Sequence, residues 1–397
     1  MTITVSGTAG KSVRRGRALN DPRLRSVVYQ IIILAVVVGV GWFLISTMLH
    51  NRAASGIAVG YDFLNGPANI RLSDDSLISY VPSDTWIRAL EVGVLNTLVV
   101  SVLGIVLATI LGIVIGVARL SGNWLVAKLA AVYVDVLRNI PLPIQLLLWI
   151  GLIRFAPPPK EAITLLPDVF ISNKGLRVPA VQSDPIFLWV GIALLIGLAI
   201  AWGIGRWARA RQAATGQPFP SFWTGLAVVV ALPVAVWLAG GAPVVLELPQ
   251  LGRFDFTGGW TRSPEFAAVL IGLSVYTAAF IAEIVRGGIL AVSHGQTEAA
   301  RALGLHSGIT LRKIILPQAL RTILPPLTSQ YLNLTKNSSL SVFVGYFDLV
   351  LVGNTMGNQT GRWVEAISIY MAIYLTISLT ISIAMNIYNR RMALRER

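Results

Sequence analysis

Long, uninterrupted apolar runs recur along the whole chain, and they constrain its fold more than any other feature of the sequence. A helical run of about 20 apolar residues is long enough to cross the roughly 30 Å hydrocarbon core of a bilayer. Such runs fall at residues 27–48, 92–118, 129–153, 186–205, 221–239, 264–285, 323–346 and 365–388. We therefore expect an all-α polytopic membrane protein with about eight transmembrane helices.

Composition supports a membrane fold and argues against several soluble classes. Charged residues make up only 13% of the 397 residues, about half of the roughly 25% that is usual in soluble domains. The chain has no cysteine, and its three histidines lack metal-binding spacing, so we expect no disulfide and no bound metal. It contains no Walker-type or dinucleotide-binding glycine motif. We therefore expect no catalytic residue and no enzyme activity in this chain.

The distribution of positive charge predicts the orientation of the chain. Of the 32 Lys and Arg residues, 21 lie in segments on the same side as the N-terminus, 10 lie in the opposite segments, and Lys336 lies within a span. Because cytoplasmic loops carry the excess of Lys and Arg, both termini are expected in the cytoplasm. The basic residues flank apolar runs and are not interleaved with stacking aromatics, so we expect no nucleic-acid partner in spite of a net charge of +14.

The segment between the sixth and seventh apolar runs carries the most informative motif. Thr297 is placed to cap a short helix that Gly304 ends, and Pro317 is placed to close a second short amphipathic segment. Two short helices joined by a glycine turn form a rigid knob that can seat in a groove of another protein. The motif positions are Glu298, Ala299, Ala300, Gly304, Ile314, Leu316 and Pro317.

This pattern resembles the EAA loop of ABC importer permeases, written EAA-x3-G-x9-I-x-LP, with every fixed position filled. The resemblance implies that residues 286–321 form a cytoplasmic loop that couples to separate ABC ATPase subunits. ATP and Mg would then be bound by those ATPases and not by this chain. The alternative is an ordinary interfacial loop, whose Arg312 and Lys313 meet lipid headgroups.

Flanking segments resemble one branch of that family, the polar and general L-amino-acid uptake permeases of the histidine, glutamate and aspartate type. The resemblance rests on residues 137–146, 277–288 and 334–340, with Asn337 where the family has Asp. It implies a small amino-acid substrate, a second permease (a copy or a homologue), a periplasmic substrate-binding protein and a place in the bacterial inner membrane. The alternative is an ion-driven secondary transporter of small polar solutes.

The resemblance also divides the chain into segments. A five-helix permease core is expected at 92–153 and 264–388, with an insertion at 154–263 that carries two extra transmembrane helices. The expected remainder is a basic cytoplasmic tail (1–26), the first transmembrane helix (27–48), a periplasmic loop (49–91) and a cytoplasmic tail (389–397).

The sixth and seventh spans carry polar residues that cannot face lipid tails, so they must line protein or water. An amino acid presents a carboxylate and an ammonium, for which cations and a carboxylate or amides are suitable partners. The alternative is that Glu283 only neutralises Lys336 or Arg286. The candidate substrate-pathway residues are Glu283, Arg286, Gln330, Asn333, Lys336 and Asn337.

Overall fold

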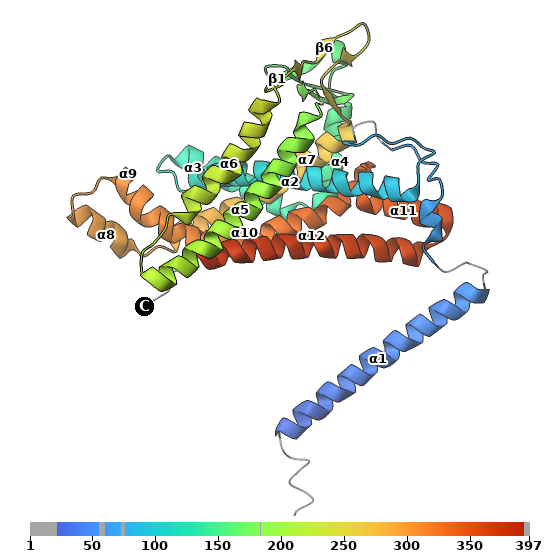
Figure 1. Cartoon of the computed structure of the whole chain (residues 1–397), viewed down its shortest axis with the longest axis horizontal. Coiled ribbons are helices and arrows are strands. Elements are labelled where there is room, and N and C mark those ends of the chain that lie inside the picture. The colour runs from blue at the N-terminus through green and yellow to red at the C-terminus, as the bar shows by residue number, and fades with distance from the viewer. Residues whose placement is uncertain (1–21, 55–59, 73–75, 183, 393–397) are drawn as a thin grey trace, which may run out of the picture.

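The computed structural model describes residues 22–54, 60–72, 76–182 and 184–392 (Figure 1). Most of the expected tail at 1–26, and residues 393–397 of the other tail, lie outside these ranges. The α-helices are α1 (Pro22–Ala54), α2 (Trp86–Ala118), α3 (Trp124–Asn139), α4 (Leu142–Arg154), α5 (Ile186–Thr215), α6 (Ser221–Ala239), α7 (Pro264–Leu290), α8 (His294–Ala302), α9 (Ser307–Thr310), α10 (Leu316–Asn337), α11 (Leu349–Thr360) and α12 (Trp363–Met392). Short 3-10 helices are η1 (Asp62–Asn65), η2 (Pro159–Glu161) and η4 (Ser338–Val344), and η3 (Leu311–Ile315) is a π-helix.

The described residues contain six helices that are long and apolar enough to cross a membrane, or up to eight if each of two bent pairs forms one span. One bent pair joins α3 to α4 at 109°, and the other joins Ser307–Val344 to Leu349–Thr360 at 52°. The apolar run at 129–153 is therefore two helices and not one straight span. The break lies at Ile140, because Pro141 disfavours a helical conformation in the residue before it, and Ile140 is extended with ψ 127°.

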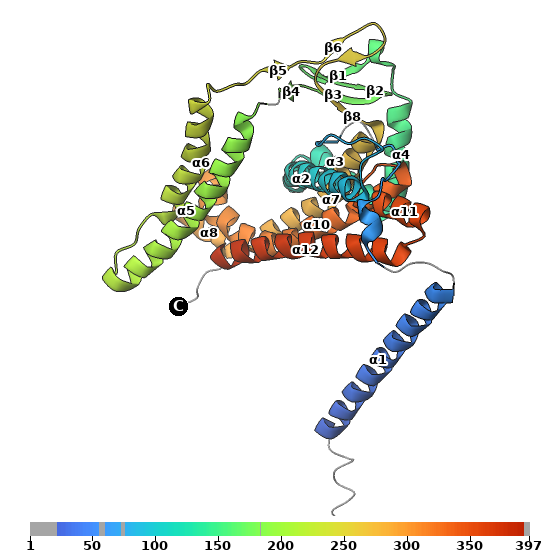
Figure 2. The same cartoon turned by 45° about the vertical axis from the view of Figure 1, so that its right-hand side comes forward.

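Helix α7 is the centre of the core, and α2, α3, α4 and α10 pack around it (Figure 2). The seam with α2 is so close that it requires glycine on α2. A Cβ atom at Gly112 would lie 2.6 Å from the Cβ of Ile281, and one at Gly116 would lie 2.7 Å from the carbonyl oxygen of Ala282. No side chain fits at these distances, so the close packing of α2 on α7 depends on glycine at both positions.

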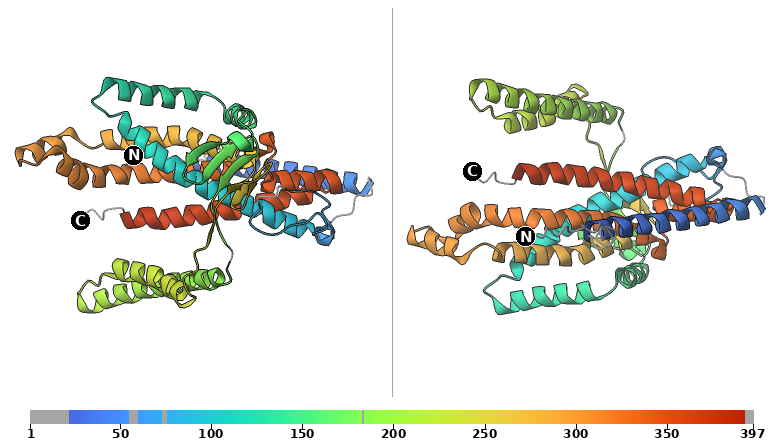
Figure 3. Two further views of the ribbon diagram at one scale, coloured as in Figure 1. Left: turned by 90° about the horizontal axis from the view of Figure 1, so that it is seen from above. Right: turned by 90° about the horizontal axis from the view of Figure 1, so that it is seen from below.

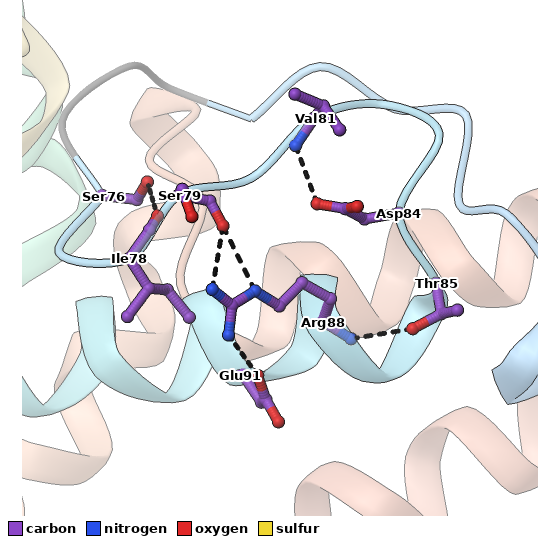
Figure 4. A network of polar contacts seen from close by, with 8 residues as sticks. All are labelled: Ser76, Ile78, Ser79, Val81, Asp84, Thr85, Arg88 and Glu91. Carbon is purple, nitrogen blue, oxygen red and sulfur yellow. Dashed lines mark hydrogen bonds and ion pairs between the residues drawn. The ribbon is translucent and has the colours of Figure 1, made fainter.

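The segment before α2 is held against that helix by polar contacts (Figure 4). Thr85 caps α2 by accepting a hydrogen bond from the backbone N–H of Arg88 at 3.3 Å. The Arg88 guanidinium donates to the carbonyl of Ser79 at 3.0 and 3.2 Å and pairs with Glu91 at 2.9 Å. Asp84 accepts from the N–H of Val81, which closes the turn before the cap.

The expected insertion contains short strands that the sequence analysis did not predict. They are β1 (Ile163–Leu166), β2 (Val169–Ser172), β3 (Gly175–Val178), β4 (Ala180–Val181), β5 (Leu246–Glu247), β6 (Gln250–Leu251), β7 (Phe256–Thr257) and β8 (Trp260–Arg262). Four form an antiparallel sheet in the order β1-β2-β3-β8, and β4–β5 and β6–β7 form two-stranded ribbons.

Two charged side chains organise this β region. Arg262 is buried, and its guanidinium lies over the rings of Trp260 (4.2 Å) and Phe266 (5.2 Å), which fastens β8 to the start of α7. Asp255 pairs with Lys174 at 2.9 Å and Arg177 at 3.2 Å. Burial opposes ionisation of Asp255, but hydrogen bonds from Lys174 and the Phe256 backbone, with the nearby positive charges, hold its pKa below the usual range.

Helices α5 and α6 form a hairpin packed through small residues. A Cβ atom at Gly197 would lie 3.2 Å from the Cα of Val229, and one at Gly225 would lie 3.2 Å from the Cβ of Ala201. Gly216 ends α5 in the left-handed conformation, with φ 70°. The hairpin lies on the side of the core where α12 lies, opposite α3 (Figure 3). Helix α1 stands apart from the bundle (Figure 1).

Candidate functional site

The segment between α7 and α10 is a pair of short helices joined by a tight turn. Gly304 has φ 74°, as expected for the residue that ends a helix. Its N–H donates to the carbonyl of Arg301 at 2.9 Å, and the N–H of Leu305 donates to the carbonyl of Ala300 at 3.0 Å. These two bonds form a Schellman motif, which satisfies the last carbonyl groups of α8 and fixes the direction of the chain after it.

Two local expectations about this segment are wrong. Helix α8 begins at His294 with Ser293 at its N-cap, so Thr297 lies inside the helix and does not cap it. Pro317 does not close the second short helix, because η3 runs directly into α10 and Pro317 lies in the first turn of α10. The backbone is helical on both sides of this junction, so the N–H that Pro317 lacks interrupts the helical hydrogen-bond ladder there, directly after the π-helix η3.

The helix pair projects beyond the other helices of the core at one end (Figure 1). Its exposed surface is part apolar and part charged. Leu303 is 78% exposed and Leu311 is 47% exposed, although both are large apolar residues. The Glu298 carboxylate is also exposed and accepts from His294 at 3.0 Å. Ala300 is buried within the pair, whereas Leu316 and Pro317 are exposed. An exposed apolar surface of this kind, bordered by charge, is typical of a protein-docking site.

The helix pair is connected to two long helices of the core. Only residues 291–293 separate α7 from α8, and η3 is continuous with α10. The Gln318 side chain donates to the carbonyl of Ile314 at 2.9 Å and contacts the amide oxygen of Gln296 at 3.4 Å. A Cβ atom at Gly288 would lie 2.2 Å from Ile323, so α7 and α10 also touch just above the pair. A force on α8 is therefore passed to both α7 and α10.

A charge cluster joins the C-terminal ends of α2 and α3 to the last third of α7. Glu283 pairs with Arg286 on its own helix at 2.6 Å and with Arg119 at the end of α2. Arg138, at the end of α3, lies over the ring of Phe280 at 5.0 Å. The structure thus brings together Glu283 and Arg286, as the neutralisation alternative expected, but Glu283 pairs with Arg119 and not with Lys336. This cluster joins α2 to α7.

The polar residues of α10 lie in different surroundings. Gln330 and Asn337 are half-buried, whereas Asn333 and Lys336 are exposed. Lys336 lines an open groove of about 410 Å³ between α10 and α12, together with Ser339 and Ser378. Within the part of the chain that the structure describes, no carboxylate lies within ion-pair distance of Lys336. A lysine in this position cannot face lipid tails without a large cost, so water or another protein must cover the groove.

The structure also contains a buried polar network that the sequence analysis missed. Asp348 is fully buried and accepts hydrogen bonds from the N–H of Leu351 at 2.9 Å and the hydroxyl of Tyr374 at 3.2 Å. On α2, Thr97 accepts from the N–H of Leu349 at 3.1 Å, and Asn96 donates to the carbonyl of Phe347 at 2.9 Å. The network joins α2, α11 and α12. Its sequence signal is Asp348 directly before the apolar run of α11, the pattern of an N-cap.

Comparison with known proteins identifies the family. Residues 193–394 match the family described as "Binding-protein-dependent transport system inner membrane component". The general L-amino acid transport system permease protein AapQ of Rhizobium johnstonii is 48% identical over 381 residues, which cover 96% of this chain and 95% of AapQ. The chain belongs to this family. It is a multi-pass membrane subunit of the ABC importer class, a permease.

Two further relatives resemble this permease over nearly their whole length. A putative amino-acid ABC transporter permease protein of Escherichia coli, YhdX, is 45% identical, with 97% of this chain and 98% of YhdX covered. The glutamate/glutamine/aspartate/asparagine transport system permease protein BztB of Rhodobacter capsulatus is 44% identical, with 97% of each chain covered. Among solved structures, an amino acid ABC transporter with histidines is 21% identical, covers 77% of this permease and 95% of that chain, and has a TM-score of 0.46.

Proposed function

We propose that this permease forms half of the translocation pathway of an ATP-driven amino-acid importer in the bacterial inner membrane, with both termini in the cytoplasm. The names of its near-full-length relatives, all permease proteins of amino-acid systems, support the substrate class. Family membership does not favour the ion-driven alternative. The other partners in the proposal are two ABC ATPase subunits, a second permease and an external substrate-binding protein.

The observation that carries the proposal is the projecting helix pair. A docking knob must be rigid and exposed, and it must be connected to the helices that it moves. The Schellman motif at Gly304 supports rigidity, Leu303 and Leu311 supply exposed apolar surface, and the continuity with α7 and α10 supplies the connection. In the proposal, ATP and Mg are bound by the ATPase subunits, and closure of those subunits draws the knobs of two permeases together.

The motif positions have separable roles in this proposal. Glu298 and Leu316 offer exposed contacts to the ATPase, while the buried Ala300 lets α8 pack closely on its neighbour. Ala299 is exposed and small, so the groove of the ATPase can approach the helix backbone there. Ile314, which is half-buried, and Pro317 belong to the connection to α10. Gly304 sets the angle between the two short helices.

The proposed substrate contacts lie on α10. Lys336 is available to a substrate carboxylate in the groove, and Asn333 is exposed one turn before it. Gln330 and Asn337 are half-buried and are weaker candidates. The engagement of Glu283 with Arg119 and Arg286 favours a structural role for Glu283 and Arg286 over a place in the pathway.

The test is reconstitution into proteoliposomes together with an ABC ATPase, a second permease and a substrate-binding protein from the same organism. Uptake of a radiolabelled amino acid should require ATP on the ATPase side and should persist when ionophores collapse the ion gradients. Uptake that continues without ATP and stops with an ionophore would sink the proposal and favour the ion-driven alternative.

A further inference from the structure

The α5–α6 hairpin has a surface that the rest of the chain does not use. Only its inner seam is buried, at Ala193, Gly197, Ala208 and Gly225. Within the described residues, the two helices pack extensively on each other and make at most sparse contact with the helices of the core. All other faces of the hairpin are open, and apart from the basic end of α5 at residues 206–212 they are mostly apolar.

The connection between the hairpin and the core is narrow. The chain enters α5 from β4 and returns from α6 to β5, and these two strands pair with Ala180 opposite Glu247 and Val181 opposite Leu246. One more hydrogen bond, from the N–H of Gln182 to the carbonyl of Val245 at 2.9 Å, extends the strap by a residue. The hairpin is therefore held beside the core by a two-stranded strap on the external side (Figure 2).

The other end of the hairpin has the features of a membrane-surface anchor. The guanidinium of Arg206 lies over the ring of Trp202 at 5.0 Å, and that of Arg211 lies over the ring of Trp207 at 5.4 Å. Arginine and tryptophan together are typical of the headgroup region, so the tip is held at the cytoplasmic surface. The hairpin thus crosses the bilayer at a fixed depth but at a distance from its own core.

The hairpin flanks the side of the core on which α12 lies, and α12 also borders the groove that holds Lys336. In both views of Figure 3, α12 is the core helix that lies between the hairpin and the rest of the bundle. The groove that α12 forms with α10 holds Lys336 and two serines, which lipid tails cannot cover. A second permease is the partner that the proposed function places against this groove. A helix of that partner packed on α12 would also be able to contact the open face of the hairpin.

We propose that the α5–α6 hairpin is a clasp, which packs its outer apolar face on transmembrane helices of the second permease and holds the two permeases together. This inference rests on the proposed function, since it needs a second permease. The strap carries the hairpin to the α12 side of the core, and α12 also borders the groove with Lys336, so the occupant that we infer is a transmembrane protein and not lipid.

Photo-crosslinking in membranes tests the contact directly. The chain has no cysteine, so single cysteines can be introduced one at a time and labelled with a benzophenone maleimide. We expect adducts with the tagged second permease on one stripe of α5 or α6, with a period of three to four residues, and lipid adducts elsewhere. Lipid adducts at every position, or protein adducts without helical periodicity, would overturn the proposal. One stripe to scan on α6 is Phe222, Leu226, Val230, Val234 and Leu238, of which all are exposed.

Excision of the hairpin tests its contribution to assembly. Residues 183–244 are replaced by Asn-Gly, which joins Gln182 to Val245 in a two-residue turn and keeps the β4–β5 pairing. Two spans are removed together, so the orientation of the later helices is preserved. We expect recovery of the second permease with the tagged chain in mild detergent to fall about tenfold or more. Unchanged recovery would overturn the proposal.

Two controls separate this proposal from its premise. Before crosslinking or excision, the ATPase and the second permease are co-purified with the tagged full-length chain, and their presence tests the proposed function by itself. Limited proteolysis of the excised variant tests whether its core is folded, and the crosslinking arm uses the full-length chain and does not depend on that result.

Discussion

The sharpest prediction concerns Gly304, whose conformation and surroundings allow the effect of a substitution to be worked out. At φ 74° an L-residue is strained, and the cost is about 1–2 kcal/mol, with a β-branched residue at the upper end. A Cβ atom at this position would meet nothing within 4 Å, so the strain is confined to the backbone turn. Gly304→Val should therefore depopulate the native turn by about 5- to 30-fold without disturbing the core.

The chain offers a matched control for this change. Gly216 is also a helix-ending glycine in the left-handed region, at φ 70°, and a Cβ atom there also meets nothing within 4 Å. It lies in the turn between α5 and α6, outside the proposed coupling segment. Gly216→Val should produce the same local strain with no loss of ATPase.

The assay is recovery of the ATPase with the tagged permease in mild detergent, followed by ATP-dependent uptake by the reconstituted complex. Gly304→Val should lower both, while the amount of permease in the membrane stays unchanged. Gly304→Asn should lie between the wild type and Gly304→Val, because asparagine tolerates the left-handed conformation. Equal losses for Gly304→Val and Gly216→Val would mean that strain acts through folding. Full ATPase recovery with Gly304→Val would refute the role of the turn in coupling.

Three further predictions follow from the charged groups. Lys336→Ala should raise the half-saturation concentration for uptake about tenfold with no loss of assembly, the equivalent of one charge-assisted hydrogen bond, while Lys128→Ala should leave uptake kinetics unchanged. Glu283→Gln leaves Arg119 and Arg286 without a carboxylate at the junction of α2 and α7. It should destabilise the purified protein by about 1–2 kcal/mol, measured by thermal unfolding, whereas Glu283→Asp should retain part of that stability. The pKa of Asp255 is lowered in the folded state, so its carboxylate stabilises the fold, and Asp255→Asn removes that stabilisation. The difference in unfolding free energy between wild type and Asp255→Asn should be constant above about pH 4 and should disappear as the pH falls through the folded pKa. A difference that grows on acidification would contradict this sign.

The long helices and the coupling motif could be predicted from sequence because their signals are local. An apolar run of sufficient length specifies a membrane helix, and Gly304 specifies a helix end through its own conformational freedom. The N-cap of α8 was predicted wrongly, although its signal is also local. Both Ser293 and Thr297 can cap a helix, and α8 begins at the first of them, directly after the end of α7. The break at Ile140 has a local cause in Pro141, but the 109° angle depends on the packing of α4 against α7.

The contacts that define the candidate site could not be predicted in the same way. Arg119 and Glu283 are 164 positions apart, and no pattern of either segment indicates the other. The strands of the insertion are two to four residues long, too short to show an alternating pattern, and Gly and Pro residues surround them. Tertiary packing decides both features.

The seam between α2 and α7 has a consequence for the biogenesis of this protein. During synthesis, α2 is complete 146 residues before Pro264 begins α7, which at about 5–20 residues per second is a delay of roughly 7–30 s. Over that interval the glycine face of α2, at Gly112 and Gly116, has no α7 to pack against. The hairpin of α5 and α6, by contrast, has both of its helices within one short stretch of chain. The central pair of helices in this protein therefore forms late in synthesis, and factors that protect new membrane helices are needed most in the interval between the completion of α2 and the synthesis of α7.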